Sequence, residues 1–225
     1  MGERLSQTLV KYRAETRTAG KGLFLIEAGT QTYGYKADDP APGGFKASLK
    51  DTQLLIRALN LGIDGFNHWS FVNRGDQDGQ WQLVDTWDRG WKQWLDEAVP
   101  HRDAYYVLGL ATRHVPMRAQ VLATQVTGGW VQDIPRVWTT AVRSPKDGSL
   151  TLLIVNDAEQ PWTALLAIEG LKRNLSVLRS QSNTSPAFNY ETVETRGDHA
   201  ELKLEPLSLT ILTDTPLPAD GPGRF

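Results

Sequence analysis

The sequence predicts an α/β segment followed by an all-β segment, and the spacing of apolar residues carries this prediction. Before residue 117, helical patterns alternate with two short apolar runs. From Val121 onwards, short alternating runs recur between turn residues. A chain of 225 residues is long enough for one large or two small domains. We therefore expect domains at residues 1–116 and 117–215, and a flexible tail at 216–225 that is rich in Pro and Gly.

The composition excludes several classes of function. Charged residues make up 22% of the chain and the net charge is −2, so no broad basic surface suggests nucleic-acid binding. The absence of cysteine excludes disulfides, thiolate zinc sites and thiol catalysis. No apolar run approaches the ~20 residues of a membrane span, and the first residues, Met1–Arg4, contain no apolar signal region. We expect no cofactor and no membrane contact, and the compartment stays open.

The N-terminal half predicts the order helix, strand, loop, helix, strand. A period near 3.6 indicates an amphipathic helix over residues 3–18. The apolar run at 23–28 predicts a strand that is buried on both faces. A loop as long as the one at 30–47 is usually functional or disordered. Ser48 is the expected N-cap of the next helix, and residues 63–71 contain the second strand. This spacing predicts a βαβ unit.

The rest of the chain predicts mainly strands. Residues 72–94 are rich in Gly, Asp and Trp and indicate little regular structure, with a short turn or helix near 89–97. A helix is expected at 103–113, ended by Pro116. Short runs between turn signals then predict an antiparallel β-sandwich, and the expected strands are 138–143, 150–155, 164–168, 175–179, 200–204 and 207–212.

Glu27 closes the first predicted strand and is the candidate site residue that the pattern indicates most directly. The carboxyl ends of parallel strands are where α/β folds carry their chemistry. A charged side chain there costs free energy unless it is hydrogen-bonded or used. Glu27 is therefore either a catalytic carboxylate or the ion-pair partner of a nearby arginine.

The order of these features resembles the C-terminal end of a retaining glycoside hydrolase. The features are the strand that ends in Glu27, the stretch Gly65–Phe71, a helix with Tyr105 and Tyr106, and an appended sandwich. The clan it resembles has a (β/α)8 barrel and includes glucosylceramidases, xylanases and xylosidases. The resemblance implies a partial barrel, made of the last two strands and their helices, followed by a β-sandwich. It also implies hydrolysis of O-glycosyl bonds in a poly- or oligosaccharide, with Glu27 as nucleophile and Trp69 as the floor of the sugar site.

Several other side chains are candidates for sugar binding. An indole ring such as that of Trp69 can pack on the apolar face of a pyranose, although Trp69 could equally be a core residue. His68 could hydrogen-bond a sugar hydroxyl or Glu27, or be an interior histidine. Tyr33 and Tyr35 follow Glu27 on the loop and could line the site. A further group of tryptophans could extend a glycan groove or cover the barrel rim: Trp81, Trp87, Trp91 and Trp94.

The sequence departs from such an enzyme in its second carboxyl group. A retaining mechanism needs two carboxyl groups about 5 Å apart, and the acid/base Glu of the clan has no counterpart here. Asp76, Asp78 and Asp64 are possible substitutes, but turn formation and the start of a strand explain them equally well. Residues 76–79 resemble a calcium loop only superficially, because Trp87 occupies the position of the bidentate Glu. We therefore expect no metal site.

Two functions from different classes remain. The first is a glycoside hydrolase, or its C-terminal part, that acts on a carbohydrate through Glu27. The second is a non-catalytic carbohydrate-binding or self-assembling module derived from such an enzyme. In either case two strands cannot close a barrel of eight, and an exposed strand edge invites pairing with another chain. We therefore expect a homo-oligomer formed through the N-terminal half.

Overall fold

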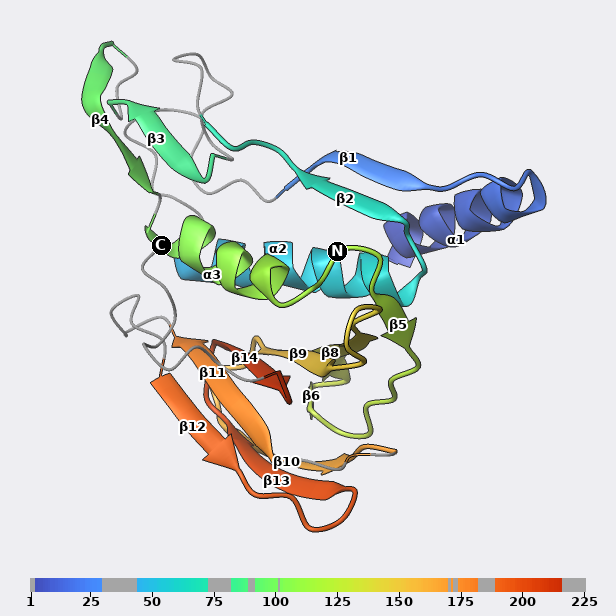
Figure 1. Cartoon of the computed structure of the whole chain (residues 1–225). Helices are drawn as coiled ribbons and strands as arrows, with labels where there is room; N and C mark the ends of the chain where they lie inside the picture. The colour runs from blue at the N-terminus through green and yellow to red at the C-terminus, as the bar shows by residue number, and fades with distance from the viewer. Residues whose placement is uncertain are drawn as a thin grey trace. The chain divides into compact units, whose positions relative to one another are not determined.

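The chain forms two compact units, residues Met1–Gly109 and Leu110–Phe225. A computed structural model describes residues 3–29, 44–72, 82–88, 92–100, 102–169, 171, 174–181 and 189–215 (Figure 1). The division falls inside the third helix, somewhat before the boundary expected at residue 117. The predicted tail, 216–225, lies outside the described residues.

The first unit mixes helices with short strands. Its elements are α1 (Glu3–Thr18), β1 (Phe24–Ala28), α2 (Gly44–Asn60), β2 (Gly65–His68), β3 (Val84–Trp87), β4 (Trp94–Pro100) and the first part of α3 (Arg102–Arg113). The helices predicted at 3–18 and 103–113 are confirmed, α3 starting one residue earlier than expected. Among the described residues, no helix is both long and apolar enough to cross a membrane.

Strands β1 and β2 form a two-stranded parallel sheet with helices on one face. Phe24 is paired with Gly65 and Leu25 with Phe66, so that both strands end on the same side. A small hydrophobic core lies between the helices and this sheet. Leu9 of α1, Ala58 of α2 and Ile63 are buried in it, and four partly buried residues pack against them: Leu23, Leu25, Leu61 and Phe66. The prediction of a parallel βαβ arrangement is therefore confirmed at this sheet.

The opposite face of β1 is open, which contradicts the prediction that this strand is buried on both faces. Phe24 is 62% exposed and Ile26 is 68% exposed. Successive side chains of a strand point to opposite faces, so the helices cover Leu25 and leave Phe24 and Ile26 uncovered. The run of apolar residues predicts the strand correctly. Whether both faces of the strand are buried depends on which other elements pack against them, and the run itself does not encode this.

Two further expectations for this unit differ from what the structure shows. Helix α2 begins at Gly44 rather than at Ser48, and Ser48 is buried inside the helix, where its carbonyl oxygen accepts a hydrogen bond from Thr52 Oγ1 at 3.2 Å. No helix is found among the described residues of the stretch 89–97, for which the sequence predicts a short turn or helix: Trp94–Glu97 belong to β4, which pairs with β3 in an antiparallel hairpin with Trp87 opposite Trp94.

The second unit consists mainly of antiparallel strands. Its strands are β5 (Gln120–Leu122), β6 (Trp130–Val131), β7 (Ile134–Pro135), β8 (Val137–Arg143), β9 (Leu150–Asn156), β10 (Trp162–Ala167), β11 (Leu175–Gln181), β12 (Asn189–Val193), β13 (His199–Leu204) and β14 (Ser208–Thr213). Six of them form one sheet in the order β12-β11-β14-β9-β8-β5, and β10 pairs separately with β13. Each of the six strands predicted from the sequence overlaps one of these strands.

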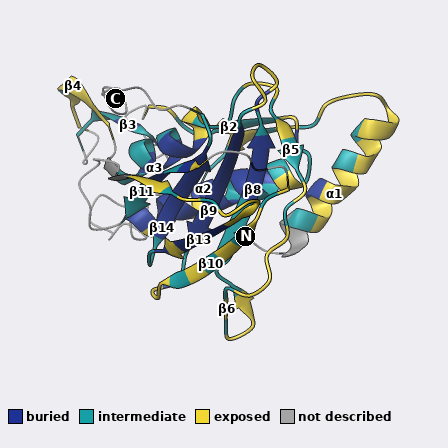
Figure 2. Cartoon of the chain, turned by 60° about the horizontal axis from the view of Figure 1, so that its bottom comes forward, coloured by how far each residue is buried: buried dark blue, intermediate teal, exposed yellow. Residues whose placement is uncertain are grey.

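The two sheets of this unit share one hydrophobic core. Buried side chains from the six-stranded sheet, such as Leu152 and Val177, cluster with Leu202 and Leu204 of β13. Trp162 and Leu166 of β10 pack against the same cluster. Strands β9 and β14 are buried along their whole length, and Figure 2 shows buried residues along both. Burial of this kind supplies most of the stabilising free energy of a β domain.

A histidine at the end of α3 makes the stability of the second unit depend on pH. Burial lowers the pKa of His114, the positive charge of Arg113 lowers this pKa further, and a hydrogen bond between Nδ1 and the Leu110 carbonyl oxygen at 2.9 Å opposes the shift. The unfolded chain therefore binds a proton at a higher pH than the folded chain does. The contribution of His114 to stability is complete above pH 6.5 and is lost as the pH falls below it.

We expect urea unfolding to show a lower free energy of unfolding at pH 5.5 than at pH 7.5, with part of this difference caused by His114. His114→Gln keeps a donor for the Leu110 carbonyl oxygen but does not titrate, so the difference between the two pH values should shrink. His199→Gln is the control, because this histidine is exposed on the surface. Equal pH dependence in the parent and in His114→Gln would contradict the prediction.

Candidate functional site

Glu27 lies at the carboxyl end of β1, where the sequence predicts it. The pairing with β2 shifts register between Leu25 and Ala28, and the backbone of Glu27 is left-handed, with φ 58°. Bulged or left-handed backbone at a non-glycine residue is uncommon and is often found where a side chain must be redirected. The side chain of Glu27 is exposed, and within the described part of the chain it forms no ion pair. The alternative of an arginine-paired structural Glu therefore has no support among these residues.

Trp69 and His68 come to the same end of the sheet as Glu27. His68 is paired with Ala28 across the strands, and the amide of Trp69 donates a hydrogen bond to the Ala28 carbonyl oxygen at 3.0 Å. Trp69 is half-buried, and the peptide bond between Trp69 and Ser70 is cis. An exposed carboxylate and a partly open indole ring thus lie on adjacent strand ends.

Gly29 lets these two strand ends approach closely. A Cβ atom at this position would lie 2.5 Å from the carbonyl oxygen of Trp69 and 3.1 Å from Cε1 of the His68 ring. No side chain can be accommodated at the first of these distances without moving the backbone. The absence of a side chain at Gly29 therefore positions Trp69 and His68 beside the end of β1.

Gly29→Ala is expected to destabilise the protein by about 1–3 kcal/mol, because the new methyl group would overpack against backbone atoms. Gly65→Ala is the matched comparison. Its Cβ would meet the ring of Phe24, which is an exposed side chain that can turn away. Urea unfolding of both variants should show the larger loss of stability for Gly29→Ala. A smaller loss for Gly29→Ala than for Gly65→Ala would contradict this account of the strand ends.

The ring of His68 is buried between the end of β2 and α2, and it is not part of the exposed surface of the site. Its Nδ1 lies 3.8 Å from Oδ2 of Asp51, and both side chains are buried. Asp51 belongs to α2, so this helix positions the ring against the end of β2. The geometry favours the interpretation of His68 as an interior histidine that supports the neighbouring Trp69.

Asp64 has a structural role at the opposite end of the sheet. Its Oδ2 accepts a hydrogen bond from the Leu23 amide at 2.8 Å, and its carboxylate pairs with Arg13 of α1 at 2.9 Å. Because the strands are parallel and Asp64 precedes the Gly65–Phe24 pair, about 13 Å of strand separates it from Glu27. Retaining catalysis needs a spacing of about 5 Å, so Asp64 does not fit the role of acid.

Several predicted site residues lie outside the described residues: Tyr33, Tyr35, Asp76, Asp78, Trp81 and Trp91. The described tryptophans of the same region, Trp87 and Trp94, face each other across the β3–β4 hairpin. Sequence reasoning gave neither Asp51 nor Gly29 a role in the site. Asp51 could have been noticed as a charged residue on the apolar, buried face of a predicted helix. Among the described residues, no group of three or more His, Asp or Glu side chains is placed to hold a metal ion.

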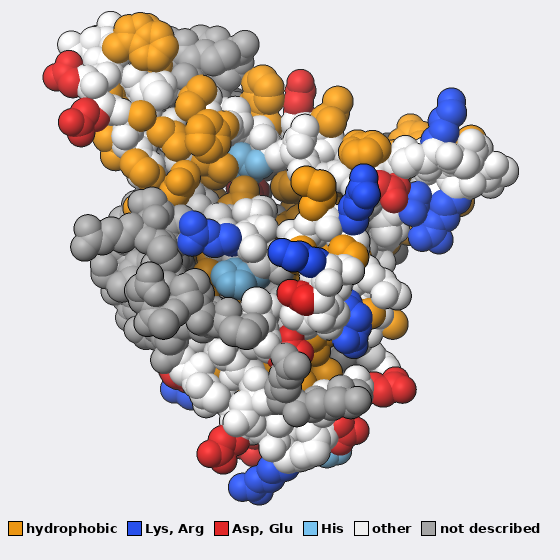
Figure 3. All heavy atoms as spheres, in the orientation of Figure 1, with side chains coloured by type: hydrophobic (Ala, Val, Ile, Leu, Met, Phe, Trp, Pro, Cys, Tyr) orange, Lys and Arg blue, Asp and Glu red, His pale blue; other side chains and the backbone are white. Residues whose placement is uncertain are grey.

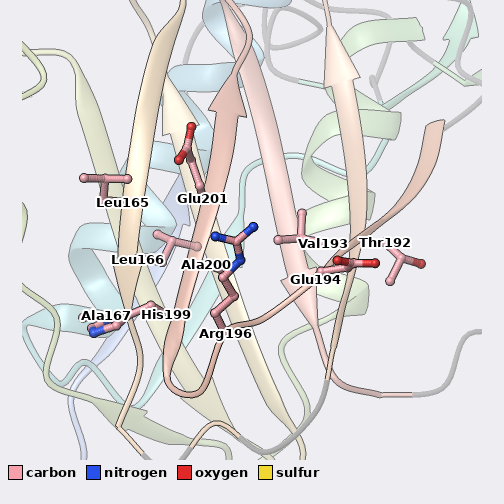
Figure 4. A pocket seen from close by; sticks show the side chains of 10 residues that line it. All are labelled: Leu165, Leu166, Ala167, Thr192, Val193, Glu194, Arg196, His199, Ala200 and Glu201. Carbon is pink, nitrogen blue, oxygen red and sulfur yellow. The ribbon is translucent and has the colours of Figure 1, made fainter.

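A hollow in the second unit does not contain any of the predicted site residues. Its lining comes from β10, from β13 and from the end of β12 with the turn that follows (Figure 4). Leu166, Val193 and Ala200 contribute apolar atoms, and Arg196 and Glu201 contribute charges of opposite sign. None of the described residues that line it is a Trp, Tyr or Phe, so it lacks the large ring on which a sugar would stack.

Comparison with known proteins identifies the fold. No family model and no curated protein matches the sequence. Solved structures do match. A conserved exported protein from Bacteroides fragilis aligns at TM-score 0.64 and 10% identity, over 92% of this chain and 43% of that one. The family 30, subfamily 8 xylanase from Clostridium acetobutylicum aligns at TM-score 0.61 and 13% identity, over 88% and 43%.

A second family of enzymes matches in the same way. The family 51 arabinofuranosidase from Xanthomonas axonopodis pv. citri aligns at TM-score 0.59 and 19% identity, over 93% of this chain and 46% of that one. The chain has a glycoside hydrolase-like fold. It spans less than half the length of each of these proteins. At identities this low the similarity concerns the fold, and the chemistry of this chain has to be argued from its own site.

Proposed function

We propose that this chain carries the nucleophile of a retaining glycoside hydrolase, with Glu27 in that role. The single observation that supports this most is the placement of Glu27, whose exposed carboxylate stands at a left-handed, bulged strand end next to Trp69. In this proposal β1 and β2 correspond to the last two strands of a (β/α)8 barrel, whose active site lies at the carboxyl ends of its strands. The second unit corresponds to an appended antiparallel β-sandwich.

The proposed reaction has two steps. The carboxylate of Glu27 attacks the anomeric carbon, the bond from this carbon to the glycosidic oxygen breaks, and a second carboxyl group gives its proton to the leaving oxygen. Water then attacks the anomeric carbon, the bond from this carbon to the Glu27 oxygen breaks and restores the carboxylate, and the second group, now a base, takes up the proton of the water. The face of Trp69 would support the sugar ring during both steps through contacts with its apolar C–H groups.

The second carboxyl group is the open element of this mechanism. Asp51 is buried beside His68 and Asp64 lies at the far end of the sheet, so neither is suited to protonate a leaving group beside Glu27. Asp76 and Asp78, on the stretch that follows Trp69, are the candidates within this sequence. A carboxyl group from a neighbouring copy of the chain is the alternative source.

A non-catalytic carbohydrate-binding module is the second candidate function. The engagement of Asp51 and Asp64 elsewhere favours it, because a single carboxylate cannot complete the retaining cycle for an unactivated glycoside. In this case Trp69 would still hold a sugar, and Glu27 would accept hydrogen bonds from its hydroxyl groups.

A screen of aryl glycosides separates the two functions. Xylosides, arabinofuranosides and glucosides would be offered with 4-nitrophenyl and with 2,4-dinitrophenyl leaving groups. A complete hydrolase releases both phenols. A chain that has the nucleophile but no acid releases only dinitrophenol, since this leaving group departs without a proton. A protein that binds saccharides but releases neither phenol is a binding module, and the proposal of catalysis fails.

We further propose that the chain self-associates through its first unit. Among the described residues the β1–β2 sheet has two strands, and an isolated pair of strands is marginal in water. Phe24 and Ile26 form an apolar surface on the face of β1 that the helices leave open. A second copy that presents the same surface would cover it in an isologous contact of the kind found in cyclic dimers.

A further inference from the structure

The β3–β4 hairpin is an exposed aromatic element that the proposed reaction does not use. Nearly every residue of β4 from Trp94 to Pro100 is exposed. Figure 3 shows hydrophobic side chains gathered over this part of the surface. On β4 itself, Trp94 is 64% exposed and Val99 is 50% exposed. Solvent-exposed apolar residues that are contiguous indicate a binding surface more often than chance exposure does.

The hairpin is attached at the same end of β2 as Trp69. The Leu83 amide donates to the carbonyl oxygen of Ser70 at 3.0 Å, and the Val84 amide donates to that of Phe71 at 2.8 Å. A parallel bridge between Val72 and Val84 extends this contact. The first strand of the hairpin therefore pairs with residues 70–72, which directly follow Trp69. It is attached at the end of the sheet where Glu27 lies.

The two tryptophans of the hairpin form a supported platform. Trp87 and Trp94 lie opposite each other in the strand pairing, and their ring centroids are 4.4 Å apart with planes inclined by 38°. Trp87 is half-buried, whereas Trp94 is 64% exposed. The Trp94 ring is thus held against another ring and remains open to solvent. A ring fixed in this way loses little conformational entropy when a ligand stacks on it.

The end of the hairpin next to this platform is braced by hydrogen bonds. Asp88 Oδ1 accepts hydrogen bonds from the amides of Lys92 at 2.6 Å and Gln93 at 3.0 Å. The Asp88 amide in turn donates to the Gln93 carbonyl oxygen at 3.0 Å. These bonds fix the backbone beside Trp87 and Trp94, so the exposed ring is presented from an ordered element.

An exposed carboxylate, that of Asp96, follows the platform residue Trp94 on the same strand. Asp96 lies two residues after Trp94, in the part of β4 where the pairing with β3 is irregular, and its side chain is exposed. An indole face contacts the C–H side of a sugar ring, and a carboxylate accepts hydrogen bonds from the hydroxyl groups around it. An apolar ring beside an exposed carboxylate suits a saccharide better than it suits a purely apolar partner.

We propose that the β3–β4 hairpin is a second saccharide-binding element, with Trp94 as its platform and Asp96 as an acceptor for sugar hydroxyl groups. This inference rests on the proposed function of the site at Glu27 and specifies its substrate class. Because Trp94 and Trp69 belong to elements attached at the same end of β2, one extended ligand reaches both. The ligand is an oligo- or polysaccharide chain rather than a single terminal sugar.

Isothermal titration calorimetry with the Glu27→Gln protein tests this proposal without turnover. The probes are hexasaccharides and disaccharides of β-1,4-linked xylose, β-1,4-linked glucose and α-1,5-linked arabinose. With the hexasaccharide that binds best, Trp94→Ala should raise Kd by about threefold to tenfold, the loss of one aromatic stacking contact. The Kd of the corresponding disaccharide should not change. Trp130→Ala is the matched control, because Trp130 is also on a two-stranded hairpin and is 53% exposed.

The possible results separate this proposal from the function on which it rests. If Trp94→Ala leaves the hexasaccharide Kd unchanged while Trp69→Ala raises it, the site at Glu27 stands and the second element is rejected. If Trp94→Ala changes the mass of the protein in light scattering and not its sugar affinity, the hairpin is a contact between copies and the proposal is wrong. If the Glu27→Gln protein binds none of the saccharides, both the function and this inference fail.

Discussion

Glu27→Gln is expected to lower kcat for glycoside hydrolysis by about a thousandfold or more, because an amide cannot attack the anomeric carbon. The two side chains have nearly the same shape. Glu27 is exposed and forms no ion pair within the described part of the chain, so the free energy of unfolding should hardly change. The measurement is the rate of phenol release from the aryl glycoside that the unmodified protein cleaves fastest.

Glu15→Gln provides the control for this loss. Glu15 is an exposed glutamate of the same unit, and its ion pair with Lys11 at 4.0 Å on α1 is a surface contact of little energetic weight. Its replacement should leave kcat unchanged. If Glu27→Gln turned over as fast as Glu15→Gln, the nucleophile would have to be another residue.

Phe24→Asp or Ile26→Asp is expected to convert the protein from an oligomer to a monomer. Each variant places a charge in the centre of the apolar surface on the open face of β1, where a second copy would have to bury it without a partner. Such burial costs enough free energy to reduce association by several orders of magnitude. Size exclusion with light scattering should give at least twice the 25.0 kDa of one chain for the parent protein and close to that mass for both variants.

Leu165→Asp separates this surface from a general effect of added charge. Leu165 is 80% exposed on β10 in the second unit, and its replacement should not change the mass of the oligomer. A parent protein that runs as a stable monomer at micromolar concentration would reject self-association. So would variants at Phe24 and Ile26 that associate as well as the parent does.

The elements that the sequence predicts well are those with a strong periodic pattern. Helices α1 and α3 and the core strands of the second unit have apolar residues at the expected spacing, and their ranges agree closely. The start of α2 at Gly44 was not predictable from Ser48, because a serine within a helix can be buried as easily as it can cap one. Strand β12 was missed because its sequence, from Asn189 to Val193, is too polar to alternate clearly.

The candidate site was predictable in part for a related reason. The position of Glu27 at the end of an apolar run indicates the end of a strand. The helix-length spacing between Glu27 and Trp69 indicates that Trp69 ends a second, parallel strand beside the first. The contact between Asp51 and His68 joins a helix to a strand, and no local pattern encodes it. Strand β4 lacks alternation because nearly all of its residues are exposed, so the tryptophans of the hairpin appear in the sequence as an irregular cluster.

The most direct test of the central claim is covalent trapping of the nucleophile. The protein would be incubated with 2,4-dinitrophenyl 2-deoxy-2-fluoro glycosides of xylose, arabinofuranose and glucose, whose leaving group departs without a proton and whose fluorine slows hydrolysis of the ester. The account predicts that one of these reagents adds a single fluoroglycosyl group, and that peptide mass spectrometry locates it on Glu27. An adduct on any other residue, or an unmodified protein with all three reagents, would contradict the assignment of Glu27 as the nucleophile.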